Sequence, residues 1–470
     1  MKVDFNRLDR AFNPKCLVVI GDKKESNYRW LRSHSNFKGK LYSVQIDPSE
    51  IEGIKALGVE NFASLMDIPG PVDLAIVAVP RQVAPRILDD CIRKEVAAAH
   101  FFTAGFSETD TSEGKELERL LTEKAEKANF HLVGPNCMGV FNPSLGLGGE
   151  LKYTAPAGSV GLIAQSGTHA VIFNHEAHLQ GLDINKSVSF GNGIVLDSPD
   201  YLEYFGQDPR IKVIGMYLEG VKDGQRFLSV LKEVTSHKPV VIWKGGRTEE
   251  GGRAIASHTS SLAVSQTVWD AAVRQYGAVK VSRLEELIDT MKALLFLSPV
   301  TGNRVAITGG SGGQSVAISD VFPEAGLKVP MLSKQSYEEL LSFYNLVGGG
   351  YLNPIDTGNT NARQIRRIVE ILMRDTGTDN LVVLINTSLG PIGPLEETIA
   401  LLVETRNKST RPILAIVPSS FSPEDVVKVR DVMLRLRDGG IPAYTTLERG
   451  AFALRKALDY YTLKNSRVSG

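Results

Sequence analysis

Short runs of aliphatic and β-branched residues recur along this chain, and stretches with a helical pattern separate them. Runs that are apolar throughout are typical of strands in a parallel sheet, because crossover helices bury both of its faces. The alternation predicts an α/β protein whose strand-to-helix turns gather at the carboxyl edges of the sheets, where such folds bind ligands. The runs are CLVVIG, KLYSVQI, DLAIVAVP, AAAHFFTAG, SVGLIAQSG, KSVSFGN, IKVIGMYLEG, PVVIWKGG, RVAITGGSG, NLVVLINTS and PILAIVP.

Two segments rich in Gly and Pro interrupt the alternation, at residues 134–159 and 298–303. A chain of 470 residues exceeds what one hydrophobic core usually holds. We therefore expect three domains of comparable size, over residues 1–133, 154–297 and 301–470.

The second and third predicted domains contain a faint repeat. A shift of 145 residues aligns Val160 with Val305 and Ser166 with Ser311. In both copies an apolar strand runs into Ser-Gly and a helix follows, which indicates that one strand–turn–helix unit is used twice. Independent use of common turn residues is the alternative explanation.

The charge distribution argues against several classes of partner. Basic and acidic residues number 53 each, and the sequence offers no basic stripe for nucleic acid or for an anionic membrane. We therefore expect neither as a partner. The N-terminus lacks the pattern of a signal peptide, and no apolar run approaches the roughly 20 residues of a membrane helix, which predicts a cytoplasmic protein.

Neither a disulfide framework nor a metal site is indicated. Cys16, Cys91 and Cys137 are far apart in the sequence and form no C-x-x-C pair, so we expect three buried thiols. Residues 175–178 read HEAH, which is one residue short of H-E-x-x-H. We interpret them as two histidines on a polar helix face.

The stretch AQSGTHA, residues 164–170, ends an apolar strand and opens a helix. Backbone N–H groups and the positive end of the helix dipole then point at the sheet edge, where they favour an anion. Ser166 and Thr168 add hydroxyl groups, and Gly167 allows close approach to the backbone. A plain helix N-cap is the alternative interpretation.

Two other turns suggest different chemistry. GGSGG, residues 309–313, fits the nucleophile elbow of a serine hydrolase with Ser311 as nucleophile, but none of the eight histidines follows it in the sequence. The first turn reads VVIGDKKESN, not G-x-G-x-x-G, although Asp47 lies near the end of the second predicted strand. These departures argue against a serine hydrolase and against a dinucleotide-binding protein.

His258 lies in RAIASHTSSLA, just after a glycine-rich run. A neutral imidazole is a competent nucleophile near neutral pH, and it can attack phosphorus while its other nitrogen is held by a hydrogen bond. Glycines at 245, 246, 251 and 252 predict a flexible loop, and Glu219 ends a strand at the same sheet edge. The turn AQSGT would hold the phosphoryl group.

At this point the motifs show a resemblance. YLEG followed by KPVVIWKGGRTEEGGRAIASHTSSLAVSQTVWDAAVRQYGAV is similar to the phosphohistidine segment of the NDP-forming acyl-CoA synthetases, the superfamily of succinyl-CoA synthetase, and most of all to the ADP-forming acetyl-CoA synthetase type. GPNCMG, IAQSG, SFGN, DYLEYFGQDP, PVDLAIVAVP, TAGF, RVAITGGSGG and NPIDTG extend the likeness over nearly the whole chain. Each motif alone is weak, but the combination is specific.

The resemblance implies an N-terminal Rossmann-like CoA-binding domain followed by two flavodoxin-like, doubly wound ligase domains. It also implies the reaction acyl-CoA + ADP + phosphate ⇌ carboxylate + ATP + CoA, through an acyl phosphate and a phosphohistidine. His258 would carry the phosphoryl group and Glu219 would orient it. The phosphate-binding residues implied are Gln165, Ser166, Gly167, Thr168, Gly191 and Asn192.

The resemblance assigns CoA contacts to the turns of the first predicted domain. Lys23 and Lys24 are candidates for the CoA phosphates on charge grounds, and two solvated surface lysines are the alternative. The other CoA-binding residues implied are Gly21, Val79, Pro80, Thr103, Ala104, Gly105, Asn136 and Cys137.

The chain also departs from the family. Its first loop reads GDKKESNYRW where relatives have a G-A-S-x-x-P type of loop, Ser49 and Glu50 stand where a lysine is often found, and Ser260 replaces a glycine. These changes favour, as the alternative function, a non-catalytic or repurposed CoA-binding paralogue. The sequence also lacks an ATP-grasp domain, so the resemblance implies an α subunit whose ATP-grasp β subunit binds ATP or ADP with Mg²⁺.

Overall fold

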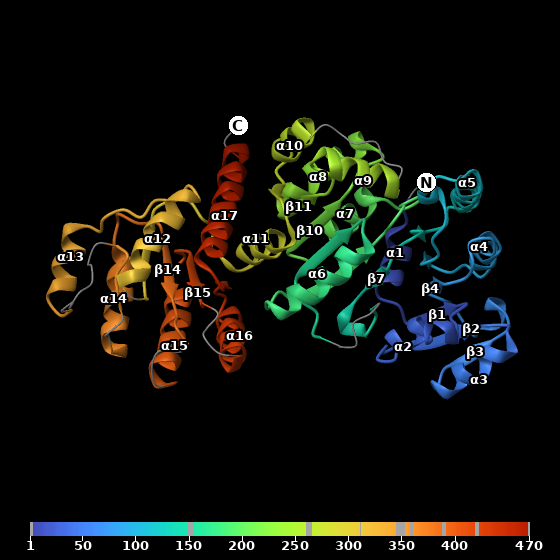
Figure 1. Cartoon of the computed structure of the whole chain (residues 1–470), viewed down its shortest axis with the longest axis horizontal. Coiled ribbons are helices and arrows are strands. Elements are labelled where there is room, and N and C mark those ends of the chain that lie inside the picture. The colour runs from blue at the N-terminus through green and yellow to red at the C-terminus, as the bar shows by residue number, and fades with distance from the viewer. Residues whose placement is uncertain are drawn as a thin grey trace. The chain divides into compact units, whose positions relative to one another are not determined.

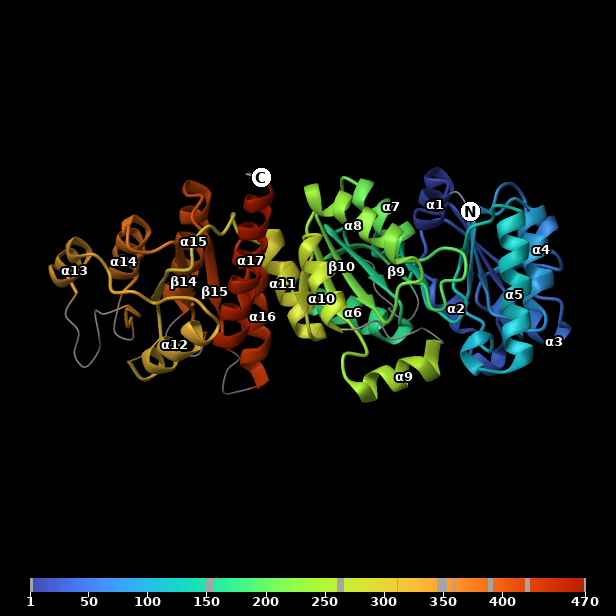
Figure 2. The ribbon, with the colours of Figure 1, turned by 90° about the horizontal axis from the view of Figure 1, so that it is seen from above.

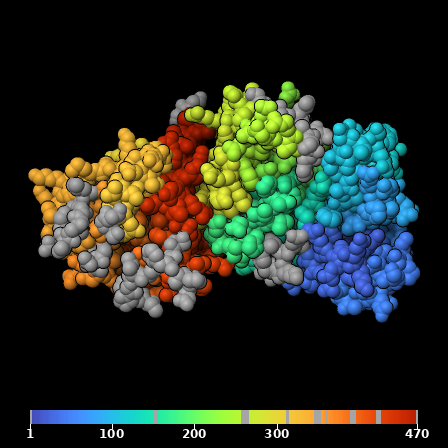
Figure 3. Space-filling model, in the orientation of Figure 1, coloured from blue at the N-terminus to red at the C-terminus, as the bar shows by residue number. Residues whose placement is uncertain are grey.

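The computed structural model describes residues 3–148, 155–259, 266–310, 312–344, 353–357, 361–387, 392–418 and 423–468. The chain divides into two compact units, Met1–Ser282 and Arg283–Gly470. Figures 1 and 2 show the units as ribbons, and Figure 3 shows their surfaces. Each unit is described by itself.

The first unit begins with a parallel sheet in the order β3-β2-β1-β4-β5-β6. Every residue of the central strand β1 is buried, as expected for a strand flanked by β2 and β4 and covered on both faces. This is the strand order of a Rossmann-like fold. The strands up to β3 are added on one side of β1 and the strands from β4 onward on its other side, so the switch point lies between β1 and β4. The strands are β1 Cys16–Ile20, β2 Lys40–Val44, β3 Glu60–Phe62, β4 Leu74–Val77, β5 Ala98–Phe101 and β6 Leu132–Val133.

Helices and single turns of 3₁₀ helix connect these strands. The α-helices are α1 Phe5–Phe12, α2 Arg29–Ser33, α3 Pro48–Ala56, α4 Ala84–Arg93 and α5 Ser112–Lys127, and the 3₁₀ turns are η1 Lys24–Ser26, η2 Leu65–Asp67, η3 Ser107–Thr109 and η4 Pro143–Leu145. Asp4 and Thr111 cap α1 and α5 by accepting hydrogen bonds from the first backbone N–H groups of those helices.

The same unit contains a second sheet in the order β12-β11-β10-β8-β9-β7. Counted from β8, its five parallel strands follow the 2-1-3-4-5 order of flavodoxin-like folds, which puts the switch point between β8 and β10. The strands are β7 Gly139–Phe141, β8 Val160–Ala164, β9 Ile184–Ser189, β10 Val213–Leu218, β11 Val240–Lys244 and β12 Val279–Val281. The helices are α6 Gly167–Leu179, α7 Ser198–Gln207, α8 Gly224–His237, α9 Glu249–Thr259 and α10 Gln266–Gln275.

The strand β7 corrects the expectation of parallel sheets throughout. It lies inside the segment 134–159, interpreted above as a boundary, and it pairs antiparallel with β9. An antiparallel strand needs no crossover helix, so a run of three residues among Gly and Pro can still join a sheet edge. The segment therefore connects the two sheets and also belongs to the second.

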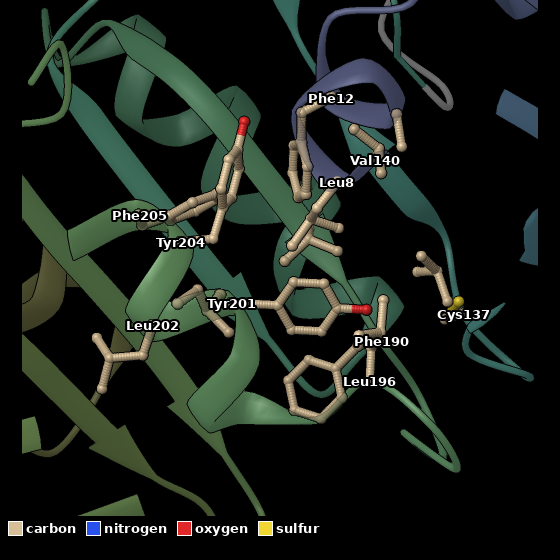
Figure 4. Packing of buried hydrophobic residues seen from close by; sticks show 14 of the residues in the cluster. Leu8, Phe12, Cys137, Val140, Phe190, Leu196, Tyr201, Leu202, Tyr204 and Phe205 are labelled. Atoms are coloured by element: carbon tan, nitrogen blue, oxygen red, sulfur yellow. The ribbon is translucent and has the colours of Figure 1, made fainter. Parts of the chain in front are cut away.

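One hydrophobic core joins the two sheets of the first unit. Phe12 of α1 packs its ring against three aromatic rings of α7, with centroids 6.4 Å from Tyr201, 5.1 Å from Tyr204 and 5.5 Å from Phe205 (Figure 4). All of these rings are buried, and Leu8 of α1 belongs to the same cluster. Burial of each large side chain contributes about 2 kcal/mol, so this contact stabilises the association of the two sheets.

The second unit is built on a parallel four-stranded sheet in the order β13-β14-β15-β16. Its strands are β13 Val305–Thr308, β14 Asn380–Leu384, β15 Ile413–Ile416 and β16 Ala443–Tyr444. Its helices are α11 Leu284–Phe296, α12 Gly312–Glu324, α13 Lys334–Leu341, α14 Ala362–Arg374, α15 Ile392–Lys408, α16 Pro423–Asp438 and α17 Leu447–Val468.

The predicted repeat is confirmed in the structure. The strands β8 and β13 begin at Val160 and Val305, and the helices α6 and α12 begin at Gly167 and Gly312, each pair 145 residues apart. The α/β fold class is likewise confirmed, as are the three buried free cysteines Cys16, Cys91 and Cys137. Within the described residues, none of the helices is both long and apolar enough to cross a bilayer.

The division into three domains stays a prediction, and one of its boundaries differs from the compact units. We placed the end of the second domain at residue 297, whereas the second unit begins at Arg283. The reason is α11, which packs against α17 and whose Asp289 receives two hydrogen bonds of 2.7 Å from Arg449.

Three buried histidines of the first unit predict acid sensitivity. Burial lowers the pKa of His34, His100 and His131 from 6.5 to about 4. The unfolded chain then binds more protons than the folded chain between these pH values, so stability is lost as the pH falls through this window, by about 3 kcal/mol per histidine at the acidic end.

Urea unfolding at a series of pH values measures this effect. His131→Gln keeps an acceptor for the Asp4 N–H, which lies 3.1 Å from Nε2 of the histidine. We expect this variant to lose close to one proton of the pH dependence between pH ~6.5 and ~4.5. His175→Gln, at an exposed position of α6, is the control. An unchanged slope for His131→Gln would contradict the assignment.

Candidate active site

A cavity of about 770 Å³ opens in the first unit, and residues that directly follow its strands line it. They come from both sheets, including Gly21 after β1, Gln165 after β8 and Glu219 after β10. Because the carboxyl ends of parallel strands meet at one edge of a sheet, two such edges bound this space. The location agrees with the expectation for ligand binding in open α/β sheets.

Most of the residues predicted for the site line this one cavity. They are Gly21, Lys23, Val79, Pro80, Thr103, Ala104, Asn136 and Cys137 from the CoA set, and Gln165, Ser166, Gly167, Thr168, Gly191, Asn192 and Glu219 from the phosphate set and its carboxylate. Lys24 and Gly105 stand outside the lining among the described residues. The side chain of His258 lies outside the described part of the chain.

The first wall of the cavity is fixed by close backbone packing. Gly21 has φ +84°, and a Cβ there would stand 2.5 Å from Cγ1 of Val79. Only glycine fits such a position without strain. Thr103 donates a hydrogen bond from Oγ1 to the carbonyl of Val79, at 2.8 Å. The turns after β1, β4 and β5 are thereby held together.

The segment between the sheets forms the second wall. Gly191 has φ +53°, and a Cβ there would meet the carbonyl oxygens of Pro135 at 2.2 Å and Asn136 at 2.3 Å. His100 reaches the carbonyl of Cys137 from Nε2, at 2.8 Å. Burial raises the pKa of the Cys137 thiol to about 12, so this side chain is an uncharged part of the wall.

The turn at the start of α6 reaches the same space. Ser166 is the N-cap of this 13-residue helix, and its Oγ accepts a hydrogen bond from the N–H of His169, at 3.4 Å. The simple N-cap interpretation is thus correct for Ser166. Gly167 and Thr168 also line the cavity, and the positive end of the helix dipole faces it, as an anion requires.

The backbone of Glu219 is held from both sides. Gln165 accepts hydrogen bonds at Oε1 from the N–H groups of Glu219, at 2.8 Å, and Gly220, at 3.1 Å. Lys244 donates from Nζ to the carbonyl of Glu219, at 2.7 Å. The amide oxygen of Gln165 thus accepts from two backbone N–H groups, and its predicted contact with phosphate stays a prediction.

Sequence reasoning missed Lys244, which ends the buried strand β11. Its ammonium group is buried, also donates to the carbonyl of Gly245 at 2.7 Å, and lies 5.8 Å from the ring centroid of Trp269. Burial lowers its pKa. A lysine within an apolar strand was the available signal, because a buried ammonium group needs partners.

An aromatic cluster supports the Glu219 side chain. Tyr217 donates from its hydroxyl group to Oε1 of Glu219, at 3.2 Å. The rings of His169 and Trp243 lie 4.4 Å and 4.6 Å from the Tyr217 ring. Burial and the nearby Glu219 carboxylate raise the pKa of Tyr217, so its hydroxyl group stays a donor at neutral pH.

Two carboxylates that contact the cavity residue Asn192 were not predicted. Asn192 donates from Nδ2 to Glu108, at 2.7 Å, and to Glu118, at 2.9 Å. The amide of Asn192 is therefore paired with these carboxylates, and its predicted role in phosphate binding stays a prediction. η3, which begins one residue before Glu108, contacts α9.

The segment that contains His258 forms a helix, where we predicted a flexible glycine-rich loop. Residues 249–259 form α9, which stands apart from the helices that cover the sheet (Figure 2). Ile255 is buried beside Gly246, where a Cβ would stand 2.2 Å from its Cδ1 atom. Thr248 caps the helix through the N–H of Gly251, at 3.1 Å. The cap and this contact outweigh the low helix propensity of glycine.

Two other features of the sequence, the histidines of HEAH and the serine of GGSGG, concern a metal site and a serine hydrolase. His178 lies 3.3 Å from a carboxylate oxygen of Asp183, and the described residues contain no group of three or more His, Cys, Asp or Glu side chains suited to a metal ion. Ser311 lies outside the described residues.

Residues 16–143 match a family described as a CoA binding domain, and residues 157–294 match a succinyl-CoA ligase like flavodoxin domain. The α subunit of ADP-forming acetate–CoA ligase II from Pyrococcus furiosus is 34% identical over 456 residues, which cover 95% of this chain and 96% of that protein. The ADP-forming acetate–CoA ligase I of Archaeoglobus fulgidus is 36% identical over 79% of this chain and 54% of its own length.

A solved structure gives the same result. The dinucleotide forming acetyl-coenzyme A synthetase 1 of Ca. Korarchaeum cryptofilum, in complex with phosphate and ADP, superposes with a TM-score of 0.83 at 28% identity, over 98% of each chain. This chain belongs to the ADP-forming acetate–CoA ligase family. As a member of that family, it has the predicted CoA-binding domain and succinyl-CoA ligase-like flavodoxin domain around its cavity.

The fixation of Glu219 yields a stability prediction. Gln165→Met keeps the side-chain length but removes the acceptor of two backbone N–H groups. Leaving buried donors unpaired lowers the free energy of unfolding by about 1–3 kcal/mol. Gln207→Met, at the exposed end of α7, is the matched control. Urea unfolding checks the pair, and equal stability of both variants would argue against this role of Gln165.

Proposed function

We propose that the chain is the α subunit of an ADP-forming acyl-CoA synthetase, which interconverts acyl-CoA, ADP and phosphate with carboxylate, ATP and CoA. One observation carries the proposal: most of the predicted CoA residues, the N-terminus of α6 and Glu219 line the same cavity. A thioester and a phosphate bound there meet without leaving the protein. The names of the relatives agree with this chemistry.

In the first step a phosphate oxygen attacks the carbonyl carbon of the thioester. The carbon–sulfur bond breaks, CoA leaves as a thiolate that takes up a proton, and an acyl phosphate forms. The N-terminus of α6, with Gly167 and Thr168, stabilises the phosphate charge through its dipole and N–H groups. Burial raises the pKa of Cys137 to about 12, so its thiol stays protonated and does not compete as a nucleophile.

In the second step a ring nitrogen of His258 attacks the phosphorus of the acyl phosphate. The bond between phosphorus and the carboxylate oxygen breaks, and the free carboxylate leaves. Glu219 accepts a hydrogen bond from the other ring nitrogen, so it orients the imidazole and stabilises the positive charge that develops. Glu219 is held for this task by three hydrogen bonds: its N–H donates to Gln165, and it accepts from Lys244 and Tyr217.

The phosphoryl group then passes to ADP on a separate ATP-grasp β subunit, which also binds Mg²⁺. The name of the P. furiosus relative, subunit alpha, supports this division. The A. fulgidus relative, whose name mentions no subunit, extends well beyond the matched residues, which cover 54% of it. A repurposed CoA-binding paralogue is the second candidate, favoured by the altered first turn, where Glu50 contacts the backbone.

Phosphorylation of His258 tests the proposal directly. Incubation of the chain alone with acetyl-CoA and phosphate should add one acid-labile phosphate to His258, detected by mass spectrometry under alkaline conditions. ADP should not discharge it until the β subunit is added. His258→Asn should take up no phosphate. CoA binding without phosphorylation would indicate the paralogue, and ATP formed by the chain alone would contradict the need for a partner.

The carboxylate role of Glu219 is tested separately. Glu219→Gln keeps the size of the side chain but removes the charge that stabilises the imidazolium ion. We expect phosphorylation of His258 to slow by about 100-fold or more, with little change in CoA affinity. Glu176→Gln, near the end of α6 and outside the cavity lining, should match the parent protein. Rapid-quench labelling measures the rate, and an unchanged rate would remove Glu219 from the mechanism.

A further inference from the structure

The first turn of the first sheet directs its hydrogen-bond donors to carboxylates of the chain itself. Asp22 is 2% exposed. Its Oδ1 atom accepts hydrogen bonds from the N–H of Lys23 and the hydroxyl group of Ser26, both at 3.1 Å, and Oδ2 accepts one from the N–H of Leu31, at 2.9 Å. Burial raises the pKa of Asp22, and these donors oppose that shift.

A second carboxylate reaches the same turn from α3. Oε2 of Glu50 accepts a hydrogen bond from the N–H of Lys24, at 2.7 Å. The Tyr28 hydroxyl group donates to the carbonyl of Glu50, at 3.3 Å, and the Tyr28 ring lies against Gly53. The first turn of α3 is thereby attached to the turn after β1.

The acidic residue after β2 is also used internally. Asp47 is the N-cap of α3, and its Oδ1 atom accepts hydrogen bonds from the N–H of Ser49, at 2.9 Å, and from the Ser49 hydroxyl group, at 2.7 Å. In Rossmann-like folds an acidic residue at this place binds a ribose hydroxyl group. In this chain Oδ1 of Asp47 caps the helix α3 instead.

In a dinucleotide-binding fold the N–H groups of the first turn hold the diphosphate of the ligand. A carboxylate, like a phosphate, is an anion that accepts hydrogen bonds from backbone N–H groups. In this chain Asp22 and Glu50 accept hydrogen bonds from the N–H groups of Lys23 and Lys24. These two N–H groups of the turn are therefore already paired within the protein. Any phosphate that enters must displace a carboxylate and meets its negative charge.

We infer that Asp22, which lines the cavity, and Glu50, which holds Lys24 just outside the lining, together bar a diphosphate from the first turn, so CoA is held by its pantetheine arm. The CoA phosphates then stay at the rim beside Lys23, which is exposed and lines the cavity. Dinucleotides, whose diphosphate must enter the turn, are excluded. The inference rests on the proposed CoA site and adds how that site selects its ligand.

Calorimetry on the full chain with CoA and with pantetheine tests the inference. Glu50→Gln retains an oxygen for the Lys24 N–H and removes one negative charge. We expect it to bind CoA about threefold more tightly at ~20 mM salt, an effect that shrinks at ~500 mM salt. Pantetheine has no phosphate, so its affinity should not change. Lys23→Gln should weaken CoA binding and leave pantetheine binding unaltered.

Glu52→Gln is the matched control, because Glu52 is an exposed residue of the same helix. If Glu50→Gln behaves like Glu52→Gln, weakens CoA binding, or shifts pantetheine and CoA equally, the inference is overturned while the proposed function stands. Binding of NAD⁺ by the parent protein would overturn it as well. Absence of CoA binding to the parent protein would overturn both.

Discussion

Phe12 packs into the aromatic cluster of α7, and this contact connects the first sheet to the second. Neither carboxyl edge would make the cavity alone, since its lining is drawn from the turns of both sheets. Rigid packing matters here because a reaction between two bound molecules is fast only when their reacting atoms are held within about 3–3.5 Å. The joint core supplies that rigidity away from the polar site itself.

Glu219 is also held in a fixed position by its neighbours. Its backbone N–H donates to Gln165, and its carbonyl and side chain accept from Lys244 and Tyr217. These three residues lie on or directly after the neighbouring strands β8, β10 and β11. A carboxylate held by rigid strands needs little reorganisation when charge develops beside it. The buried ammonium group of Lys244 is stabilised by two carbonyl groups and a Trp269 ring.

The sequence alone predicted the parts of this fold that depend on local pattern. Apolar runs located the strands, and Gly167 and Ser166 marked the turn before α6 because tight turns need those residue types. What it missed depends on contacts between distant residues. Glu108 meets Asn192 across 84 positions and Lys244 meets Glu219 across 25, and no periodicity encodes such pairs. The strands β3, β6, β7, β12 and β16 were missed because two or three residues carry too little pattern.

The first turn shows how a family fold can keep its shape while its ligand contacts change. The turn after β1 still needs Gly21, because the backbone there approaches Val79 whatever the ligand. Its N–H groups still need acceptors, since unpaired buried donors are costly. A tethered carboxylate meets that need without the entropy loss that a free phosphate suffers on binding. The chain thus retains the Rossmann-like turn while Asp22 and Glu50 occupy it from within.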